Sequence, residues 1–311
     1  MNAMPWHAAN WARLQARRQR DALPHALLLC GPAGLGKRLF VQRFVRGLLC
    51  ERVQEGEACG QCRSCLLFDA GTHPDVVTLG LGLRKDGTPR SEIVVEQIRD
   101  LSARLAMSSQ FGGWQVALVD PADAMNAAAA NALLKTLEEP AARTMLILLA
   151  DAPWRLPQTI RSRCQRIEFS LPPAAEAQAW LQGLGVAQPQ QALEAALGNP
   201  GLALAWAQQG ALERRIEVRR DLAALAAGRG QVTEMSRRWL DDEAAQRLWF
   251  AAQAAADERR AQAMQAAAPL ASNLDGEALA QWYDAANRTR DALRGPLRGD
   301  LLLLELLAQW R

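Results

Sequence analysis

Apolar and polar positions alternate in two different ways along the first half of the chain. Short apolar runs predict strands at 25–30, 76–80, 114–120, 145–150 and 166–169. Between them, apolar residues at helical spacing predict helices at 35–49, 95–107 and 126–139. Strands that alternate with helices favour a parallel sheet wrapped by helices on both faces. The first half therefore has the pattern of an α/β fold.

The pattern changes at Leu171–Pro173, where strand signals disappear. From there alanine, leucine, arginine and tryptophan recur at helical spacing, and no repeat of fixed period is evident. The sequence predicts an α/β domain at 1–170, a small helical domain at 171–207 and a helical region at 208–311. We expect four tryptophans of the helical region to pack its helices together: Trp239, Trp249, Trp282 and Trp310.

Composition adds limits to this picture. The 311 residues are 50% hydrophobic and 22% charged, which is globular composition and long enough for two or three domains. A net charge of +3 is too small to predict nucleic-acid binding by itself. The amino-terminal residues lack the apolar core of a signal peptide, and no run reaches the roughly 20 residues of a membrane span. We therefore expect a soluble cytoplasmic protein, in which cysteines serve as metal ligands or free thiols rather than disulfides.

Four of the six cysteines form a C-x8-C-x2-C-x2-C pattern: Cys50, Cys59, Cys62 and Cys65. Four thiolates can close a tetrahedral Zn²⁺ site, and such a site is structural because no ligand position stays open. An iron–sulfur cluster would take the same ligands, and four unrelated buried cysteines are the third interpretation. His73 lies near the cluster but is not needed as a ligand. Cys30 and Cys164 are expected to be core or buried thiols.

The residues CGPAGLGKRLF, at 30–40, contain the G-x-x-x-x-G-K pattern of a phosphate-binding loop, between a predicted strand and a predicted helix. Gly31, Gly34, Gly36 and Lys37 supply the glycines and the lysine that hold phosphates in such a loop. Arg38 stands where a Ser or Thr would hold Mg²⁺. Asp120 ends the 114–120 strand and could bind the metal, but Pro121 follows where many ATPases have a catalytic Glu. We do not expect efficient hydrolysis; weak nucleotide binding and an empty glycine turn both remain open.

Two further motifs resemble a known family. NALLKTLEEP at 131–140 and TIRSRC at 159–164 resemble the clamp-loader subunits of the AAA+ ATPases. The cysteine insert at 48–65, AGTHPD at 70–75 and GNPGLALA at 198–205 are most similar to the delta-prime group of bacterial DNA polymerase III. The resemblance is specific over about residues 20–205 and only general beyond.

The resemblance implies an AAA+ ATPase-like domain with a zinc module at about 50–65, a helical lid and a helical collar for oligomerisation. It implies a five-membered ring with the ATPase subunits (gamma or tau) and delta, which loads the sliding clamp onto primer–template DNA. It also implies that Arg163 of the SRC segment is an arginine finger for the ATP site of a neighbouring subunit.

Departures from the motor subunits occur at four separate places. Arg38 replaces the hydroxyl residue, Pro121 replaces the catalytic acid, and Gly201 stands where motors carry a lid arginine. The strand before the SRC segment ends in Leu149-Ala150 with Asp151 next, where motors end it in a polar sensor residue. These departures favour a non-motor scaffold subunit. An ATP-hydrolysing motor subunit is the alternative, and a zinc-ribbon nucleic-acid-binding protein with a decayed phosphate loop is a third hypothesis.

Overall fold

The computed structural model describes residues 4–84, 86–293 and 297–310, and the chain divides into two compact units. The first unit comprises Met1–Gly185 with Gly198–Leu202, and the second comprises Val186–Leu197 with Ala203–Arg311. Residues 171–207, expected to form a small domain, are shared between these units. The division into three domains stays a prediction.

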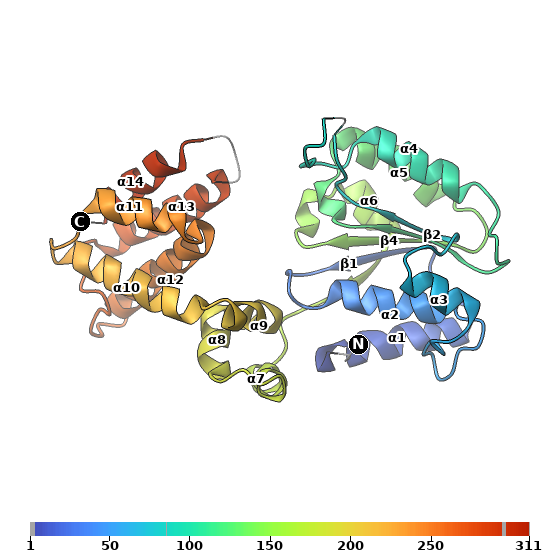
Figure 1. Cartoon of the computed structure of the whole chain (residues 1–311), viewed down its shortest axis with the longest axis horizontal. Helices are drawn as coiled ribbons and strands as arrows, with labels where there is room; N and C mark the ends of the chain where they lie inside the picture. Colours follow the sequence, from blue (N-terminus) through green and yellow to red (C-terminus); the bar gives the residue numbers. More distant parts are fainter. Residues whose placement is uncertain (1–3, 85, 294–296, 311) are drawn as a thin grey trace. The chain divides into compact units, whose positions relative to one another are not determined.

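The first unit is built on a five-stranded parallel sheet with the strand order β2–β3–β4–β1–β5 (Figure 1). The strands are β1 (Ala26–Cys30), β2 (Val76–Leu79), β3 (Gln115–Val119), β4 (Thr144–Ala150) and β5 (Gln165–Glu168). Each lies within about one residue of its predicted position. Strands β1, β3 and β4 are buried at every position, which explains their uninterrupted apolar runs.

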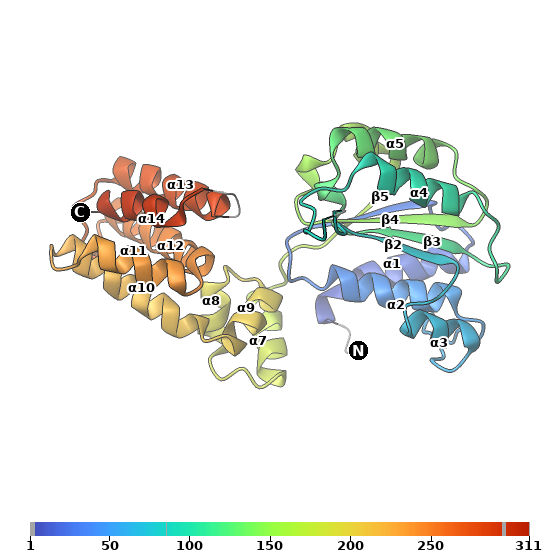
Figure 2. The ribbon, with the colours of Figure 1, turned by 45° about the horizontal axis from the view of Figure 1, so that its top comes forward.

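Helices cover both faces of this sheet (Figure 2). On one face lie α1 (Ala8–Gln19) and α2 (Lys37–Leu49), with α3 (Arg63–Asp69) beside α2; on the other lie α4 (Val95–Leu105), α5 (Ala127–Glu138) and α6 (Gln158–Arg163). Strand β1 contributes side chains to the hydrophobic cores on both faces of the sheet, because successive side chains of a strand point to opposite faces. Leu27 belongs to the core cluster that contains Phe40 of α2, whereas Leu28 belongs to the cluster that contains Ile98 of α4. The predicted α/β architecture is confirmed.

The three predicted helices of this unit are present as α2, α4 and α5. Asn126 precedes α5 and caps it, since its Oδ1 accepts a hydrogen bond of 2.9 Å from the Ala129 N–H. The pattern did not predict α1, α3 or α6. Short 3₁₀ turns are η1 (Pro5–His7), η2 (Ala122–Ala124) and η3 (Pro153–Arg155), and helix α7 (Ala174–Gly183) completes this unit.

The second unit consists of helices joined by loops, and its described residues contain no strand. It contains α8 (Pro189–Ala195), the end of α9 (Pro200–Gln208), α10 (Ala211–Ala226), α11 (Val232–Asp241), α12 (Ala244–Ala263), α13 (Gly276–Ala292) and α14 (Gly299–Ala308). Its core confirms the packing role of the four tryptophans. Trp310 packs edge-on against Trp282 with ring centroids 4.6 Å apart, and it donates to the Leu222 carbonyl at 3.0 Å. None of the described helices is both long and apolar enough to cross a membrane.

Candidate functional site: a closed phosphate loop and a four-cysteine cluster

The glycine loop joins the end of β1 to the start of α2, as the sequence predicts. Gly36 has a φ of 77°, in the left-handed region that favours glycine, and this conformation lets α2 begin at Lys37. The loop therefore has the strand–loop–helix setting in which phosphate loops present backbone N–H groups to an anion.

Lys37, the residue that would hold the phosphates, is already saturated by the protein itself. Its ammonium donates to the carbonyls of Gly31 at 2.5 Å and Pro32 at 2.7 Å, and it pairs with the Asp151 carboxylate at 2.6 Å. An ammonium has three donors, and all three are used. The side chain is only 6% exposed. A phosphate could reach Lys37 only by displacing these internal partners.

Arg38 and Asp120 form the second closed pair of the loop. The guanidinium donates from Nε to one carboxylate oxygen at 2.5 Å and from Nη2 to the other at 2.8 Å. This bidentate hydrogen bonding to the Asp120 carboxylate raises the pKa of Arg38. In a motor the acid at this position holds Mg²⁺. Here the Arg38 guanidinium, on a side chain that is 60% exposed, occupies the same carboxylate.

Three side chains from segments distant in the sequence also donate hydrogen bonds to backbone carbonyls of the loop. Trp6 Nε1 donates to the Leu35 carbonyl at 3.1 Å, and His7 Nε2 donates to the same oxygen at 2.8 Å. Asn199 Nδ2 donates to the Ala33 carbonyl at 2.7 Å. The loop is thus held from the amino-terminal segment and from the start of α9.

Gly201 of α9 lies against the loop backbone. A Cβ atom at this position would be 1.9 Å from the Gly34 carbonyl oxygen, so only glycine fits. Gly201 and Gly34 belong to the same compact unit. The position that the family resemblance associates with a lid arginine is therefore a close backbone contact.

Arg163 ends α6 on the surface of the same unit. Its guanidinium pairs with Glu138 of α5 at 2.5 Å and donates to the Thr159 carbonyl at 3.1 Å. The side chain is 38% exposed. Such an exposed pair is worth only about 0–1 kcal/mol, so the guanidinium can exchange Glu138 for another anion.

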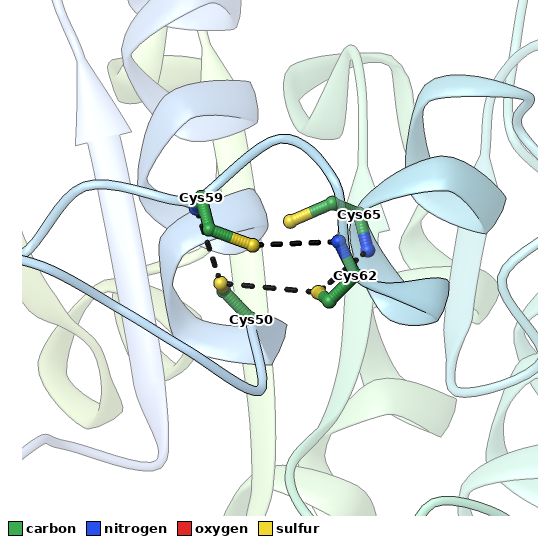
Figure 3. Close-up of side chains that lie close together, drawn as sticks. All are labelled: Cys50, Cys59, Cys62 and Cys65. Atoms are coloured by element: carbon green, nitrogen blue, oxygen red, sulfur yellow. Dashed lines mark hydrogen bonds between the residues drawn. The ribbon is translucent and has the colours of Figure 1, made fainter.

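The four cysteines of the insert converge on one point, with their side chains turned toward one another (Figure 3). All four sulfur atoms lie within 4.8 Å of one another, and Cys50 and Cys62 are 3.9 Å apart. A regular tetrahedron around Zn²⁺ with Zn–S bonds of about 2.3 Å has S···S edges of ~3.8 Å. The cluster could therefore hold a metal ion such as zinc.

Backbone N–H groups around the cluster stabilise thiolate forms. The Cys62 N–H donates to Cys59 Sγ and the Cys65 N–H donates to Cys62 Sγ, each at 3.4 Å. Backbone donors, from Gln61 first and then Cys62, lower the pKa of Cys59 to about 6. Burial raises the pKa of Cys65 to about 12. N–H···S bonds of this kind also fix the direction of each ligand atom.

His73 is not a member of the cluster but supports the module that carries it. Its Nε2 is 2.9 Å from Ser64 Oγ in α3, and its Nδ1 accepts from the Asp75 N–H at 3.2 Å. The Asp75 carboxylate accepts from Ser109 Oγ and from the N–H groups of Gln110 and Phe111. The HPD residues therefore tie the cysteine module to the sheet edge. Cys30 and Cys164 are buried, as expected.

The structure gathers the predicted loop residues Gly31, Gly34, Gly36, Lys37 and Asp120 at the carboxyl ends of β1 and β3. Sequence reasoning missed the residues that close this loop: Trp6, His7, Asp151 and Asn199. The one available signal was Asp151, an acid directly after a buried strand, where a motor carries a polar residue.

The parallel sheet, the phosphate loop and the cysteine cluster define an AAA+-like protein with a carboxy-terminal helical region. A sequence model described as "DNA polymerase III, delta subunit" matches residues 6–173, more than half of the chain. The chain therefore belongs to the DNA polymerase III delta-subunit family.

Individual relatives are similar over the same region. The chain is 42% identical to DNA polymerase III subunit delta′ of Pseudomonas aeruginosa over 218 residues, covering 69% of this chain and 64% of that protein. It is 39% identical to subunit delta′ of Escherichia coli over 209 residues, covering 66% and 61%. The chain thus matches less than two thirds of the length of these relatives. A DNA polymerase III gamma subunit-related structure from Thermotoga maritima covers 95% of this chain and 97% of its own, at TM-score 0.40 and 16% identity.

Proposed function

We propose that this chain is a delta-prime subunit of the DNA polymerase III clamp loader: a scaffold that hydrolyses no ATP itself. The observation that carries the proposal is the internal saturation of Lys37 together with the Arg38–Asp120 pair. Both groups that would engage the phosphates and Mg²⁺ already have protein partners. The similarity to delta′ subunits supports the same role.

The chemistry that this subunit contributes is the guanidinium of Arg163. We infer that in the assembled complex it leaves Glu138 and reaches the γ-phosphate in the ATP site of the adjacent gamma or tau subunit. A finger supplied by a second chain neutralises charge that grows in the transition state. A ring of head-to-tail contacts makes each such site from two chains.

The proposal includes the remaining parts of the assembly. The partners are the ATPase subunits and delta in a five-membered ring, which acts on the sliding clamp and primer–template DNA in the cytoplasm. Helices α7–α9 would form the lid, and the helices from α10 onward the oligomerising collar. The enzyme is the DNA polymerase III holoenzyme, and this chain is not catalytic alone.

We infer that the cysteine cluster holds one structural Zn²⁺ ion. Four sulfurs within 4.8 Å of one another have the spacing that suits a single ion. An iron–sulfur cluster would place several iron atoms between the cysteines and spread them further apart. The ion would fasten the insert between α2 and α3 and leave no open position for chemistry.

The first test is ATP binding and hydrolysis by the purified chain with Mg²⁺ present. We expect no hydrolysis and no binding, because a phosphate must displace three partners of Lys37. Steady turnover by the chain alone would contradict the scaffold role and favour a motor subunit.

The finger is tested in the reconstituted complex. Arg163→Ala should leave the chain folded and slow hydrolysis by the complex at least tenfold, since fingers contribute about 10³–10⁵ in well-studied GTPases. Arg166→Ala is the matched control, because Arg166 is also an exposed arginine paired with a glutamate. Equal rates for wild type and Arg163→Ala would remove the finger role.

A further inference from the structure

The segment around Arg163 has an unusual charge. Residues 152–167 contain no acidic side chain and four arginines: Arg155, Arg161, Arg163 and Arg166. Arg163 and Arg166 of this set already pair with Glu138 and Glu168 of the chain. Arg155 is exposed, so an acidic partner could bind it and could compete with Glu138 for Arg163.

The inner side of this segment is fixed in the core. Leu156, Ile160 and Cys164 follow one another at intervals of four residues and are 3%, 0% and 8% exposed. They pack with the helices on the α4–α5 side of the sheet. The opposite side therefore stays in solvent. We call the exposed side, formed by Trp154, Arg155, Gln158, Thr159, Ser162 and Arg163, the 154–163 ridge.

Trp154 is unusual on this ridge because its large apolar side chain is exposed to solvent. It is 74% exposed, although indole is a large apolar group that proteins normally bury or place at interfaces. Its turn is not loose. The Ala152 N–H donates to Asp123 Oδ2 at 2.9 Å, the Leu156 N–H donates to the Pro153 carbonyl at 3.2 Å, and Asp151 is clamped by Lys37. A rigid turn thus presents one tryptophan to solvent.

We propose that Trp154 is an anchor that docks this chain onto the neighbouring ATPase subunit, in an apolar recess with an acidic rim. The inference rests on the proposed function, because it places Trp154 on the ridge that carries the Arg163 finger. Tryptophan and arginine dominate the binding energy of protein interfaces, and a backbone turn that is already ordered loses little further entropy on docking. A single-stranded nucleic acid fits less well, since base-stacking platforms use successive aromatic side chains and the ridge has one.

The test measures the affinity of the full chain for the purified gamma or tau subunit. Trp154→Ala should raise the dissociation constant at least about tenfold, as for a central interface tryptophan. Leu83→Ala is the matched control, because Leu83 is a 65% exposed apolar residue outside the ridge. At saturating concentration, the Trp154→Ala chain should restore wild-type hydrolysis, since Arg163 is intact. An unchanged dissociation constant would overturn the anchor.

Arg163→Ala separates the anchor from the finger. It should slow hydrolysis even at saturating concentration, whereas Trp154→Ala should not; any rise in the dissociation constant of the Arg163→Ala chain reflects the loss of one ridge arginine from the acidic rim. Normal hydrolysis with Arg163→Ala and weak assembly with Trp154→Ala would remove the finger and keep the anchor. If the wild-type chain forms no complex with the ATPase subunit, both the function and the anchor are wrong. If Trp154→Ala weakens binding of a single-stranded oligonucleotide but leaves assembly unchanged, the ridge binds nucleic acid and the anchor is wrong.

Discussion

At the scale of single residues, the phosphate loop is closed by ordinary side chains in unusual pairings. Lys37 is buried with three acceptors, and such an ammonium is stable only while its partners stay in place. Like Lys37, His7 is a buried polar side chain that is hydrogen-bonded to the loop: it is 3% exposed and donates to the Leu35 carbonyl. The residues that close the loop are thus also residues that stabilise the fold.

His7 makes the stability of the first unit depend on pH. Burial is the main cause that lowers the pKa of His7, and the nearby charge of Arg43 acts in the same direction. The unfolded chain has the ordinary histidine pKa of about 6.5 and so binds more protons than the folded chain below that pH. We expect the free energy of unfolding to fall as pH drops from about 7.5 to 5.5. Urea unfolding at several pH values measures this slope.

The control for this slope is His7→Gln, which keeps a donor for Leu35 and removes the titrating ring. Its slope should be smaller than that of the wild type. Some slope should remain, because burial also lowers the pKa of His73. Identical slopes for the two chains would show that His7 does not contribute.

At the scale of elements, the start of α9 and the cysteine module hold the α/β unit at two places. Gly201→Ala would push a methyl group into the Gly34 carbonyl and should destabilise the first unit by about 1–3 kcal/mol. Gly183→Ala is the control, because nothing lies within 4 Å of a Cβ atom there. Chemical denaturation of both variants measures the difference. Equal stabilities would mean that α9 moves away from the loop without cost.

The cysteine module should depend on its ion. We expect one zinc per chain by elemental analysis, and Cys62→Ser should lose it and destabilise the first unit, because ligand binding free energy contributes to folding. Cys30→Ala is the control, since Cys30 is a buried thiol outside the cluster. A native preparation without metal, or a Cys62→Ser chain that keeps it, would contradict the structural role.

Strands and helices could be predicted from the sequence where their burial requires a clear pattern of apolar residues. The central strands are apolar except at Gln115 and Thr144, which begin β3 and β4, and α2, α4 and α5 have clear apolar faces. Helix α1 was missed because Leu14 is its one buried residue, and α6 because it is only six residues long. The loop glycines and the cysteines were found from spacing. Asn199 could not be found, because it meets Ala33 across 166 residues of sequence.

At the scale of the whole molecule, the two units have separate hydrophobic cores. Trp310 is fully buried in the second unit. Trp310→Ala should therefore destabilise that unit by about 3–5 kcal/mol and leave the metal content unchanged. Trp154→Ala, at a 74% exposed tryptophan, is the control and should change stability by less than about 0.5 kcal/mol. Calorimetry with metal analysis measures both effects. Loss of metal in Trp310→Ala would mean that the units do not unfold independently.

The contact between Gly201 and Gly34 also constrains how this sequence can evolve. An arginine introduced at 201 would collide with the loop, and a threonine introduced at 38 would leave the Asp120 carboxylate without its cation. An arginine at 201 would therefore destabilise the loop unless the Gly34 backbone had first moved away. The closed loop thus makes the order of substitutions matter, because the change at 201 is tolerated only after the backbone around Gly34 has changed.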